Sequence, residues 1–413
     1  MNDCCFDPND RMLTADEAIN FLLQRTVATT QTETVNVLDA LGRVLAQPIT
    51  STLNVPPLDN SAMDGYVIRI SDLCTEGETI LPVSQRIAAG QVGEPLAVGT
   101  AARIFTGAPV PEGADTVIMQ EQCEQRGDEV VITGNVNEGD HIRRAGEDII
   151  QGSEVMSVGH YIRPQDMGLI ASVGVANIDV YKKTRVAIFS TGDELLMPGD
   201  PVEPGKIYNS NRYTLTGLLE KAGCEIIDLG CVPDNLAATR DALQKASGQA
   251  DLIMTTGGVS VGEEDYVKAA IDELGSVEMW RVAMKPGKPV AYGEVNSVPF
   301  IGLPGNPVSV FVTFCLFARP VIRTMQGCVD VLPRKVQVRS GFDWTRKGPR
   351  REFVRAQLQS DESGQQHAVT YSSQSSGVLT STVWAHGLVE IPEHTTVAIG
   401  DSLNWLDFSE LMS

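Results

Sequence analysis

Residues 185–194 read RVAIFSTGDE, and residues 250–262 read ADLIMTTGGVSVG. Each stretch begins with an apolar run that is typical of a buried strand and continues into a polar turn with glycine. Between and after them, helical patterns in NSNRYTLTGLLEKAGC and NLAATRDALQKASGQ alternate with the apolar segments EIIDLGCVPD and VPFIGLPGNP. Because apolar strands that alternate with amphipathic helices bury both faces of a sheet, this region predicts a parallel sheet covered by helices.

The segments on either side of this α/β region have a different texture. Residues 11–28 have apolar residues at helical spacing after Thr14, and Glu17 stands three positions later, as in a capping box. Residues 53–151 contain short apolar runs broken by glycine and proline, which predicts a mainly β region. From residue 333 β-like segments return, which predicts a small barrel or sandwich. A chain of 413 residues is long enough for three or four domains.

Composition narrows the function classes. The formal charge of −21 at pH 7 argues against nonspecific binding to nucleic acid or a membrane surface, whereas a small anion is compatible if basic residues gather at one site. No stretch approaches the apolar run of a membrane helix, and MNDCCFDPND does not resemble a signal peptide, so we expect a cytoplasmic protein. The eight cysteines form no CxxC pair, and we expect them to be reduced, mostly buried and without a catalytic role.

Ligands of a doubly wound sheet bind beyond the carboxyl ends of its strands. Four loops at such positions carry glycine or charge: STGDEL (190–195), TTGGVSVGEEDY (255–266), KPGKP (285–289) and GLPGNPVS (302–309). The glycines of TTGGVSVG let backbone amides approach a ligand closely, which predicts a phosphate cradle. Asp265 is a candidate ligand for a metal ion or an amine, although acids in the first turn of a helix ordinarily serve as caps.

Two lysines point to a second kind of site. Lys285 and Lys288 flank Gly287 in a loop stiffened by prolines, which in an acidic protein suggests an oxyanion site. Asp193 and Glu194 of STGDEL are equally well explained as solvated turn residues, and GLPGNP as a rigid turn before a buried helix.

Seven motifs follow one another along the chain: DNSAMDGY (59–66), FTGAPVPEGAD (105–115), RRAGEDI (143–149), FSTGDEL (189–195), TTGGVSVGEEDY (255–266), MKPGKP (284–289) and GLPGNPVS (302–309). In isolation, the polar residues of the first three motifs have ordinary explanations as surface groups. Together and in this order, the motifs resemble the MoeA family, the molybdopterin molybdenumtransferases, which are related to the E domain of gephyrin. The resemblance runs from about residue 12 to the C-terminus.

The resemblance implies a multidomain α/β plus β fold. Its parts would be a three-layer α/β molybdopterin-binding domain (183–332), a mainly β domain (53–151), a discontinuous α-containing domain (10–52 with 152–182) and a C-terminal β-barrel (333–413). It also implies an elongated homodimer, in which the α/β domain of one subunit and parts of the other form the active cleft. The implied reaction inserts molybdate into adenylylated molybdopterin with release of AMP, in a magnesium-dependent step.

Individual roles follow from the matching positions. The glycine loop would cradle pterin or phosphate groups through Gly257, Gly258, Ser260 and Gly262, with Asp265 assisting as a catalytic group. Positions implied to bind substrate are Asp148, Lys285, Lys288, Pro304, Ser309, Arg350 and Ser376, with Arg351 as an alternative to Arg350. Further catalytic positions are Asp64, Thr106, Glu194 and Asp234. Asp64, Glu194 and Asp234 are the expected magnesium ligands.

Two other functions are compatible with parts of the sequence. The α/β domain also resembles that of the adenylyltransferase that acts one step earlier, but that enzyme lacks the region of DNSAMDGY and FTGAPVPEG. A scaffold role, like that of the gephyrin E domain, would leave Asp64, Lys285 and Asp265 without a function. Expected partners are a second copy of the chain, the adenylyltransferase and molybdoenzyme maturation proteins. Either molybdate or tungstate would satisfy the residues of the oxyanion site.

Overall fold

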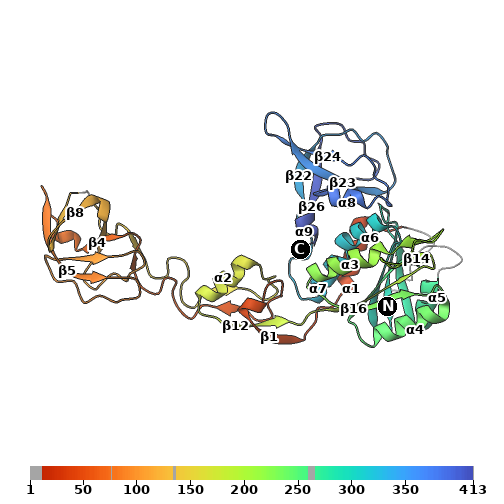
Figure 1. Cartoon of the computed structure of the whole chain (residues 1–413), viewed down its shortest axis with the longest axis horizontal. Coiled ribbons are helices and arrows are strands. Elements are labelled where there is room, and N and C mark those ends of the chain that lie inside the picture. Colours follow the sequence, from red (N-terminus) through yellow and green to blue (C-terminus); the bar gives the residue numbers. More distant parts are fainter. Residues whose placement is uncertain (1–11, 76, 134–135, 259–265, 413) are drawn as a thin grey trace, which may run out of the picture.

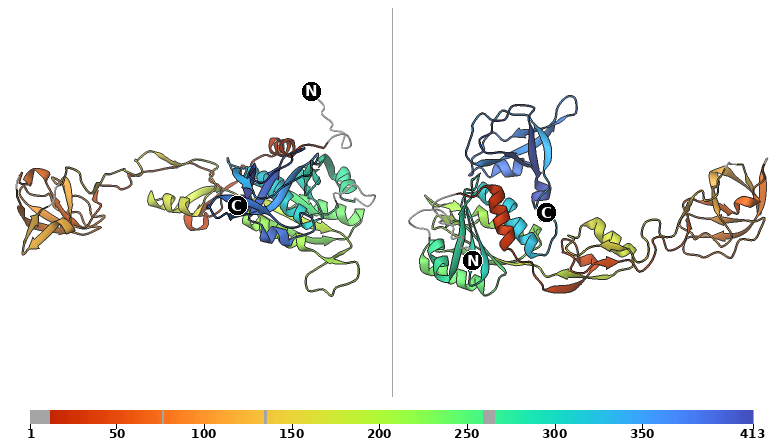
Figure 2. Two further views of the ribbon diagram at one scale, coloured as in Figure 1. Left: turned by 90° about the horizontal axis from the view of Figure 1, so that it is seen from above. Right: turned by 180° about the vertical axis from the view of Figure 1, so that it is seen from behind.

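The computed structural model describes residues 12–75, 77–133, 136–258 and 266–412. These residues form an elongated molecule (Figure 1). A β domain lies at one end, an α/β domain and a β-barrel lie together at the other end, and a small middle unit connects them. Two further views show the same separation (Figure 2). The architecture is therefore a multidomain α/β plus β fold, as expected from the sequence.

The α/β domain is built on a six-stranded sheet with the order β16-β13-β17-β21-β20-β18. Its strands are β13 (Arg185–Thr191), β16 (Glu225–Val232), β17 (Leu252–Thr256), β18 (Gly275–Arg281), β20 (Pro289–Val295) and β21 (Val298–Leu303). The strands β16, β13, β17 and β21 are parallel, as predicted. β20 runs antiparallel to β21, because Asn296 and Ser297 take positive φ angles of 50° and 66° and close a two-residue hairpin. The sheet is therefore mixed, where the sequence pattern predicted a purely parallel one.

Helices cover both faces of this sheet. They are α3 (Ser210–Lys221), α4 (Leu236–Ser247), α5 (Tyr266–Leu274), α6 (Pro307–Thr313) and α7 (Arg319–Met325), with the π-helical turn η4 (Phe314–Ala318) between the last two. α3 and the run from α6 to α7 pack on one face of the sheet. α4 and α5 pack on the other face. The parallel strands β13, β16, β17 and β21 end at the same edge of the sheet, where the sequence predicted the ligand site.

The helical run from residue 307 to 325 is long and apolar enough to cross a membrane, with a mean hydropathy of 1.5. The expectation that no stretch of the sequence approaches such a run is therefore wrong. However, 89% of the run is buried inside the protein. Because most of the run is buried, and because it contains Arg319 and Arg323, it is a core helix of this domain.

The N-terminal helix α1 (Ala15–Arg25) begins with the predicted capping box. The Glu17 amide donates to Thr14 Oγ1 at 3.2 Å, and the Thr14 amide donates to Glu17 Oε2 at 2.9 Å. The position of α1 differs from the expected one, because its apolar face packs in the core of the α/β domain rather than in the discontinuous unit. α7 and η4 provide the apolar surface that this face needs.

The middle unit joins two segments that lie far apart in the sequence. β1 (Thr32–Asn36) pairs with β12 (Asn177–Tyr181), and β2 (Ile49–Thr50) pairs with β11 (Glu154–Met156). Helix α2 (Pro164–Ser172) and the short helix η1 (Val37–Asp39) pack over them around a shared hydrophobic cluster. The chain therefore passes through this unit twice, on its way to the β domain and back.

The β domain contains a six-stranded sheet with the order β7-β4-β6-β5-β9-β8. Its strands are β4 (Gly65–Ile68), β5 (Thr79–Ile87), β6 (Ala101–Ile104), β7 (Thr116–Met119), β8 (Cys123–Arg126) and β9 (Glu129–Ile132). The short strands β3 (Asn60–Ser61) and β10 (Ile142–Arg143) pair beside this sheet. The predicted β character of this region is confirmed.

The C-terminal strands close into a five-stranded barrel, in which β23 pairs with both β24 and β25. The strands are β22 (Val336–Ser340), β23 (Arg351–Ser360), β24 (Gln366–Thr370), β25 (Gly387–Ile391) and β26 (Ser402–Asp407). Of the two predicted forms, a barrel or a sandwich, the structure has the barrel. The short strand β19 (Met284–Lys285) of the α/β domain adds to β23 in parallel, so the barrel and the α/β domain share a sheet edge.

The cysteines differ from the expectation. All six cysteines in the described part of the chain are free. Only Cys315 among them is fully buried, while Cys74 and Cys231 are exposed. The expectation that the cysteines are mostly buried is therefore wrong.

Candidate functional site

The predicted phosphate cradle begins where β17 ends. Gly257 and Gly258 have positive φ angles of 86° and 64°. A Cβ atom on Gly257 would lie 2.9 Å from the Thr191 carbonyl oxygen, and one on Gly258 would lie 2.4 Å from Val267 Cγ2. Only glycine fits both positions, so the backbone can approach a ligand closely here. Ser260, Gly262 and Asp265 lie outside the described residues, and their roles stay predictions.

An unpaired hydroxyl lies beside these glycines. Ser190 Oγ and Thr256 Oγ1 hydrogen-bond each other at 2.8 Å at the ends of β13 and β17. The neighbouring Thr191 Oγ1 is buried and has no hydrogen-bond partner among the described residues. A buried polar atom without a partner costs free energy unless a ligand or water satisfies it. The hydroxyl and the close glycine backbone therefore fit a phosphate-bearing ligand.

Three carboxylates gather next to the cradle, at the ends of β13 and β16. Burial raises the pKa of the Cys231 thiol, and the charges of Glu194, Asp193 and Asp234 raise it further, while Arg212 opposes them. The Asp234 amide approaches Asp193 Oδ1 at 3.4 Å, which ties the two loops together. Glu194 and Asp234, predicted from the sequence, therefore both act on the Cys231 thiol, and Asp193 is a third acid in these loops.

The fit of this acidic group to magnesium follows from its donor atoms. Carboxylate oxygens are the hard ligands that Mg²⁺ takes, usually one or two together with substrate phosphates and water. In the described part of the chain, no group of three or more His, Cys, Asp or Glu side chains is already arranged around a metal position. Glu194 and Asp234 thus fit magnesium as a pair that needs substrate oxygens to complete the coordination.

The predicted oxyanion site lies on the seam between the α/β domain and the barrel. Lys285 stands opposite Glu352 in the pairing of β19 with β23. Its ammonium lies 3.1 Å from Glu352 Oε2. The Arg350 guanidinium donates to the Met284 carbonyl oxygen at 3.5 Å, so Arg350 reaches the same strand from the barrel side. Two cations from two domains therefore meet at this seam, together with one carboxylate.

Ser309 lies beside the lysine loop, where its carbonyl oxygen would be 3.7 Å from a Cβ atom on Gly287. Ser309 lies in the first turn of α6 and is 3% exposed. The Ser376 carbonyl oxygen accepts a hydrogen bond of 3.1 Å from the Val308 amide, which brings the barrel loop onto this turn. Pro304 is buried in the same connection, and Lys288 is exposed at the far end of the lysine loop.

The connection between β21 and α6 also touches the phosphate cradle. The Gly257 amide donates to the Leu303 carbonyl oxygen at 3.2 Å. A Cβ atom on Gly305 would lie 3.8 Å from Gly257 Cα. One loop therefore reaches the cradle through Gly305 and the barrel seam through Val308.

Arg355 holds the barrel loop that carries Ser376. Its side chain is 1% exposed. Its Nε donates to Ser381 Oγ at 3.1 Å and its Nη2 to the Ser375 carbonyl oxygen at 3.2 Å. Burial lowers the pKa of Arg355 to about 10, and the Glu352 charge acts in the opposite direction. Arg355 therefore stays charged at neutral pH, and its hydrogen bonds hold the loop that carries Ser376.

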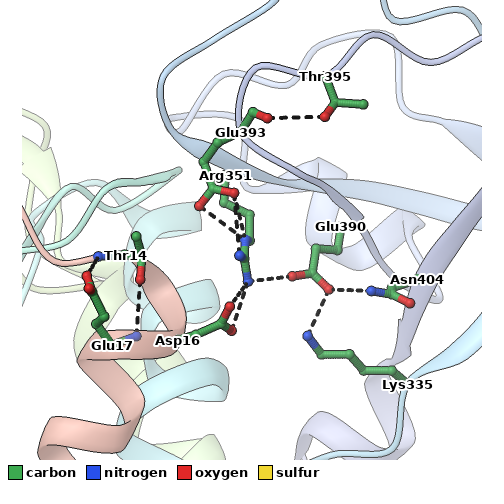
Figure 3. A network of polar contacts seen from close by, with 9 residues as sticks. All are labelled: Thr14, Asp16, Glu17, Lys335, Arg351, Glu390, Glu393, Thr395 and Asn404. Carbon is green, nitrogen blue, oxygen red and sulfur yellow. Dashed lines mark hydrogen bonds and ion pairs between the residues drawn. The ribbon is translucent and has the colours of Figure 1, made fainter.

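Arg351, the alternative to Arg350, is engaged elsewhere (Figure 3). Its Nη1 lies 2.8 Å from an Asp16 oxygen and 2.9 Å from Glu390 Oε1, and its Nε lies 3.3 Å from Glu393 Oε1. The side chain is 14% exposed, and Asp16 belongs to α1. Arg351 thus links α1 to the barrel, which favours Arg350 as the arginine that faces an oxyanion.

Asp64 and Thr106 form a pair in the β domain. Asp64 Oδ1 accepts hydrogen bonds from the Thr106 amide and from Thr106 Oγ1, both at 2.8 Å. The backbone hydrogen bond, then the hydroxyl, hold the pKa of the Asp64 carboxyl below its usual value. Asp148 is exposed, and its amide donates to the Val55 carbonyl oxygen at 2.9 Å, near the return to the middle unit.

The predicted site is therefore split within one chain. Asp64 immediately precedes β4, and Glu194 immediately precedes β14 (Leu195–Leu196), and these strands lie at opposite ends of the molecule (Figure 1). The expected magnesium ligands Asp64, Glu194 and Asp234 do not come together in a single chain. The middle unit separates the β domain from the α/β domain, so this grouping of ligands stays a prediction for the expected cleft between two subunits.

Sequence reasoning missed two residues at the seam. Glu352 and the buried role of Arg355 have no motif of their own, because Glu352 meets Lys285 only through the packing of the barrel against β19, and Arg355 is held by contacts inside the barrel. The clustering of charges in GPRREFVRAQL was a signal that this strand carries more than solvation, but it did not separate the three arginines.

Family comparisons cover nearly all of the described chain. Residues 13–174 match the MoeA N-terminal region (domain I and II), residues 187–324 match a probable molybdopterin binding domain, and residues 337–408 match the MoeA C-terminal region (domain IV). A molybdopterin molybdenumtransferase of Haemophilus influenzae is 44% identical over 317 residues, which cover 76% of this chain and 78% of that protein.

The chain belongs to the MoeA family.

Other members agree with this assignment. Molybdopterin molybdenumtransferase 2 of Mycobacterium tuberculosis is 38% identical, and the match covers 91% of this chain and 95% of that protein. The crystal structure of the molybdopterin biosynthesis MoeA protein of Pyrococcus horikoshii OT3 matches with a TM-score of 0.82 at 30% identity, and covers 96% of this chain and 100% of that chain. The split arrangement of domains is therefore shared with a solved MoeA structure.

Proposed function

We propose that this MoeA-family protein inserts molybdate into adenylylated molybdopterin and releases AMP, in a step that depends on magnesium. The observation that supports this most is the seam to which Lys285 and Arg350 belong, next to the loop that bonds to Ser376 through Val308 and touches the glycine cradle through Gly305. Molybdate is a dianion, and its binding requires fixed cations and hydrogen-bond donors. The cradle offers the matching place for a phosphate of the pterin substrate.

The chemistry asked of the protein is positioning and charge stabilisation. Lys285 and Arg350 neutralise the oxyanion, and the close backbone at Gly257 and Gly258 holds the phosphate end of the pterin. No covalent nucleophile is needed. Cys231 lies close to Glu194 and Asp193, but partial burial of its thiol and these carboxylates raise its pKa, so the thiol stays protonated and is a poor nucleophile.

Glu194 and Asp234 are the residues of this chain that would hold magnesium. When bound, magnesium supplies a hard divalent charge for the phosphoanhydride oxygens that separate as AMP. The Asp234 amide donates to Asp193 Oδ1, which holds together the loops after β13 and β16 that carry the two carboxylates. Asp64 joins this group only if it comes from a second chain.

A homodimer in the cytoplasm is the working form that we propose. The β domain of one chain, with Asp64 and Thr106, would then complete the cleft at the α/β domain of the other. The adenylyltransferase that makes the pterin substrate and the proteins that receive the cofactor are the partners that this pathway position requires. Tungstate, with the same shape and charge as molybdate, is expected to bind at the same seam.

The first test mixes purified protein with adenylylated molybdopterin, magnesium and molybdate and follows AMP release. Wild-type protein should release AMP only when molybdate is present. Lys285→Ala should lower kcat/KM at least about 100-fold, because it removes a preorganised charge from the oxyanion. Lys245→Ala, on the exposed face of α4, is the matched control and should retain wild-type activity.

A different outcome would reassign the protein. If AMP release is absent and the protein instead forms adenylylated molybdopterin from ATP and molybdopterin, it is an adenylyltransferase. If neither reaction occurs, it is a binding protein on a MoeA fold.

A further inference from the structure

A carboxylate occupies the seam where a dianion is expected to bind. The Glu352 side chain is 14% exposed and lies 3.1 Å from the Lys285 ammonium, which is 47% exposed. A negative charge in contact with this lysine repels an incoming oxyanion and also neutralises the cation that should attract it. Generic solvation does not explain Glu352, because the side chain is largely buried.

The backbone fixes Glu352 in this place. Lys285 and Glu352 are register partners of β19 and β23, so the carboxylate is presented to the lysine whenever the barrel is docked. Lysine has a flexible four-carbon side chain, and Lys285 is the more exposed of the pair. The ammonium is therefore the group that moves when a competing anion arrives.

A second cation of the same strand responds to the charge of Glu352. The buried Arg355 belongs to the same strand, and the Glu352 charge already acts on it. Arg355 has hydroxyl and carbonyl partners, and no carboxylate bonds to it among the described residues. Lys285 is therefore the cation whose contact with Glu352 the structure shows.

We propose that Glu352 is an internal competitor for Lys285, which holds the ammonium in the empty site and yields it to the oxyanion, and thereby sets the affinity for the oxyanion. This role rests on the proposed function. It makes Glu352 a residue that determines the affinity for the oxyanion in that reaction. Glu352 lowers the affinity for the oxyanion but holds the Lys285 ammonium at the seam. An anion that binds more weakly than molybdate therefore does not displace the Glu352 carboxylate from the lysine.

The test is molybdate binding to the full-length protein by titration calorimetry, without pterin. Glu352→Gln keeps the shape and a hydrogen-bonding group but removes the charge, and should bind molybdate about three- to tenfold more tightly than wild type. Glu352→Asp, whose carboxylate is withdrawn from Lys285, should lie between the two. Unchanged or weaker binding in Glu352→Gln overturns the proposed competition.

Glu393→Gln is the matched control. Glu393 is also partly buried at the barrel rim, but it pairs with Arg351 and not with Lys285. Its loss changes the net charge by the same amount and should leave molybdate affinity within about twofold of wild type. Equal tightening in both variants would show a general charge effect and would also overturn the role of Glu352.

Kinetics separates this role from a structural one. In Glu352→Gln, the KM for molybdate should fall while the KM for adenylylated molybdopterin stays unchanged. An equal change in both constants would indicate a general disturbance of the seam and count against the competitor. Tighter molybdate binding without any AMP release in wild-type protein would instead keep Glu352 as a competitor and refute the proposed function.

Discussion

At the scale of single residues, Asp64 shows how one neighbour sets the charge state of a carboxylate. The Thr106 amide and then its hydroxyl hold the pKa of Asp64 below the ordinary value of 3.8. A depressed pKa in the folded state means that the interaction stabilises the fold above that ordinary value and is lost as the pH falls through the folded pKa. The Asp64 carboxyl is therefore ionised at neutral pH and can bind a cation or accept a hydrogen bond.

Thr106→Val tests this pair. The variant keeps the backbone hydrogen bond and removes the hydroxyl, so the pKa of Asp64 should rise part of the way back toward its ordinary value. The carboxyl carbon of Asp64, followed by NMR across an acid titration, measures this directly. Thr106→Ser keeps the hydroxyl and should titrate like wild type. If Asp64 titrates at the same pH in Thr106→Val as in wild type, the hydroxyl does not contribute to the lowered pKa.

At the scale of elements, the strand after Asp64 depends on a close approach of backbones. A Cβ atom on Gly65 would lie 1.8 Å from the Ile118 carbonyl oxygen on β7. Gly65→Ala must therefore push β4 away from β7 and should destabilise the β domain by about 3 kcal/mol. Hydrogen exchange of the amides in residues 65–68 and 116–119 should accelerate accordingly.

Gly168→Ala is the opposite case and serves as the control. Gly168 lies in α2, and a Cβ atom there would have nothing within 4 Å. Alanine should stabilise this helix by about 0.5–1 kcal/mol and slow exchange in residues 164–172. Equal exchange rates in Gly65→Ala and wild type would contradict the close packing of β4 against β7.

Local pattern explains which elements were predictable. The apolar runs and helical spacing between residues 185 and 325 predicted the strands and helices of the α/β domain, because each element buries its own face. The antiparallel β20, the docking of α1 and the closure of the barrel depend on contacts between distant segments, which periodicity does not encode. The site divides in the same way: motifs located Gly257 and Lys285, whereas only packing brought Glu352 to the lysine.

At the scale of the whole molecule, function depends on how two ends of an elongated chain are used. Asp64 lies in the β domain and Lys285 on the barrel seam, with the middle unit between them (Figure 1). A site that needs both is completed most simply by two chains, in which each β domain serves the α/β domain of its partner. In a dimer of one Asp64 variant and one Lys285 variant, both defects then fall on the same site, and the other site stays intact.

Subunit mixing tests this arrangement. Asp64→Ala and Lys285→Ala proteins should each be inactive in AMP release. After subunit exchange at equal concentrations, half of the dimers are mixed and each mixed dimer has one intact site, so activity should return to about a quarter of the wild-type value. Lys285→Ala mixed with Arg350→Ala should show no gain, because both residues belong to the seam of the same chain. If verified Asp64→Ala and Lys285→Ala mixed dimers stay inactive, the two residues do not cooperate across chains, and the cleft must be built within one chain by bending of the middle unit.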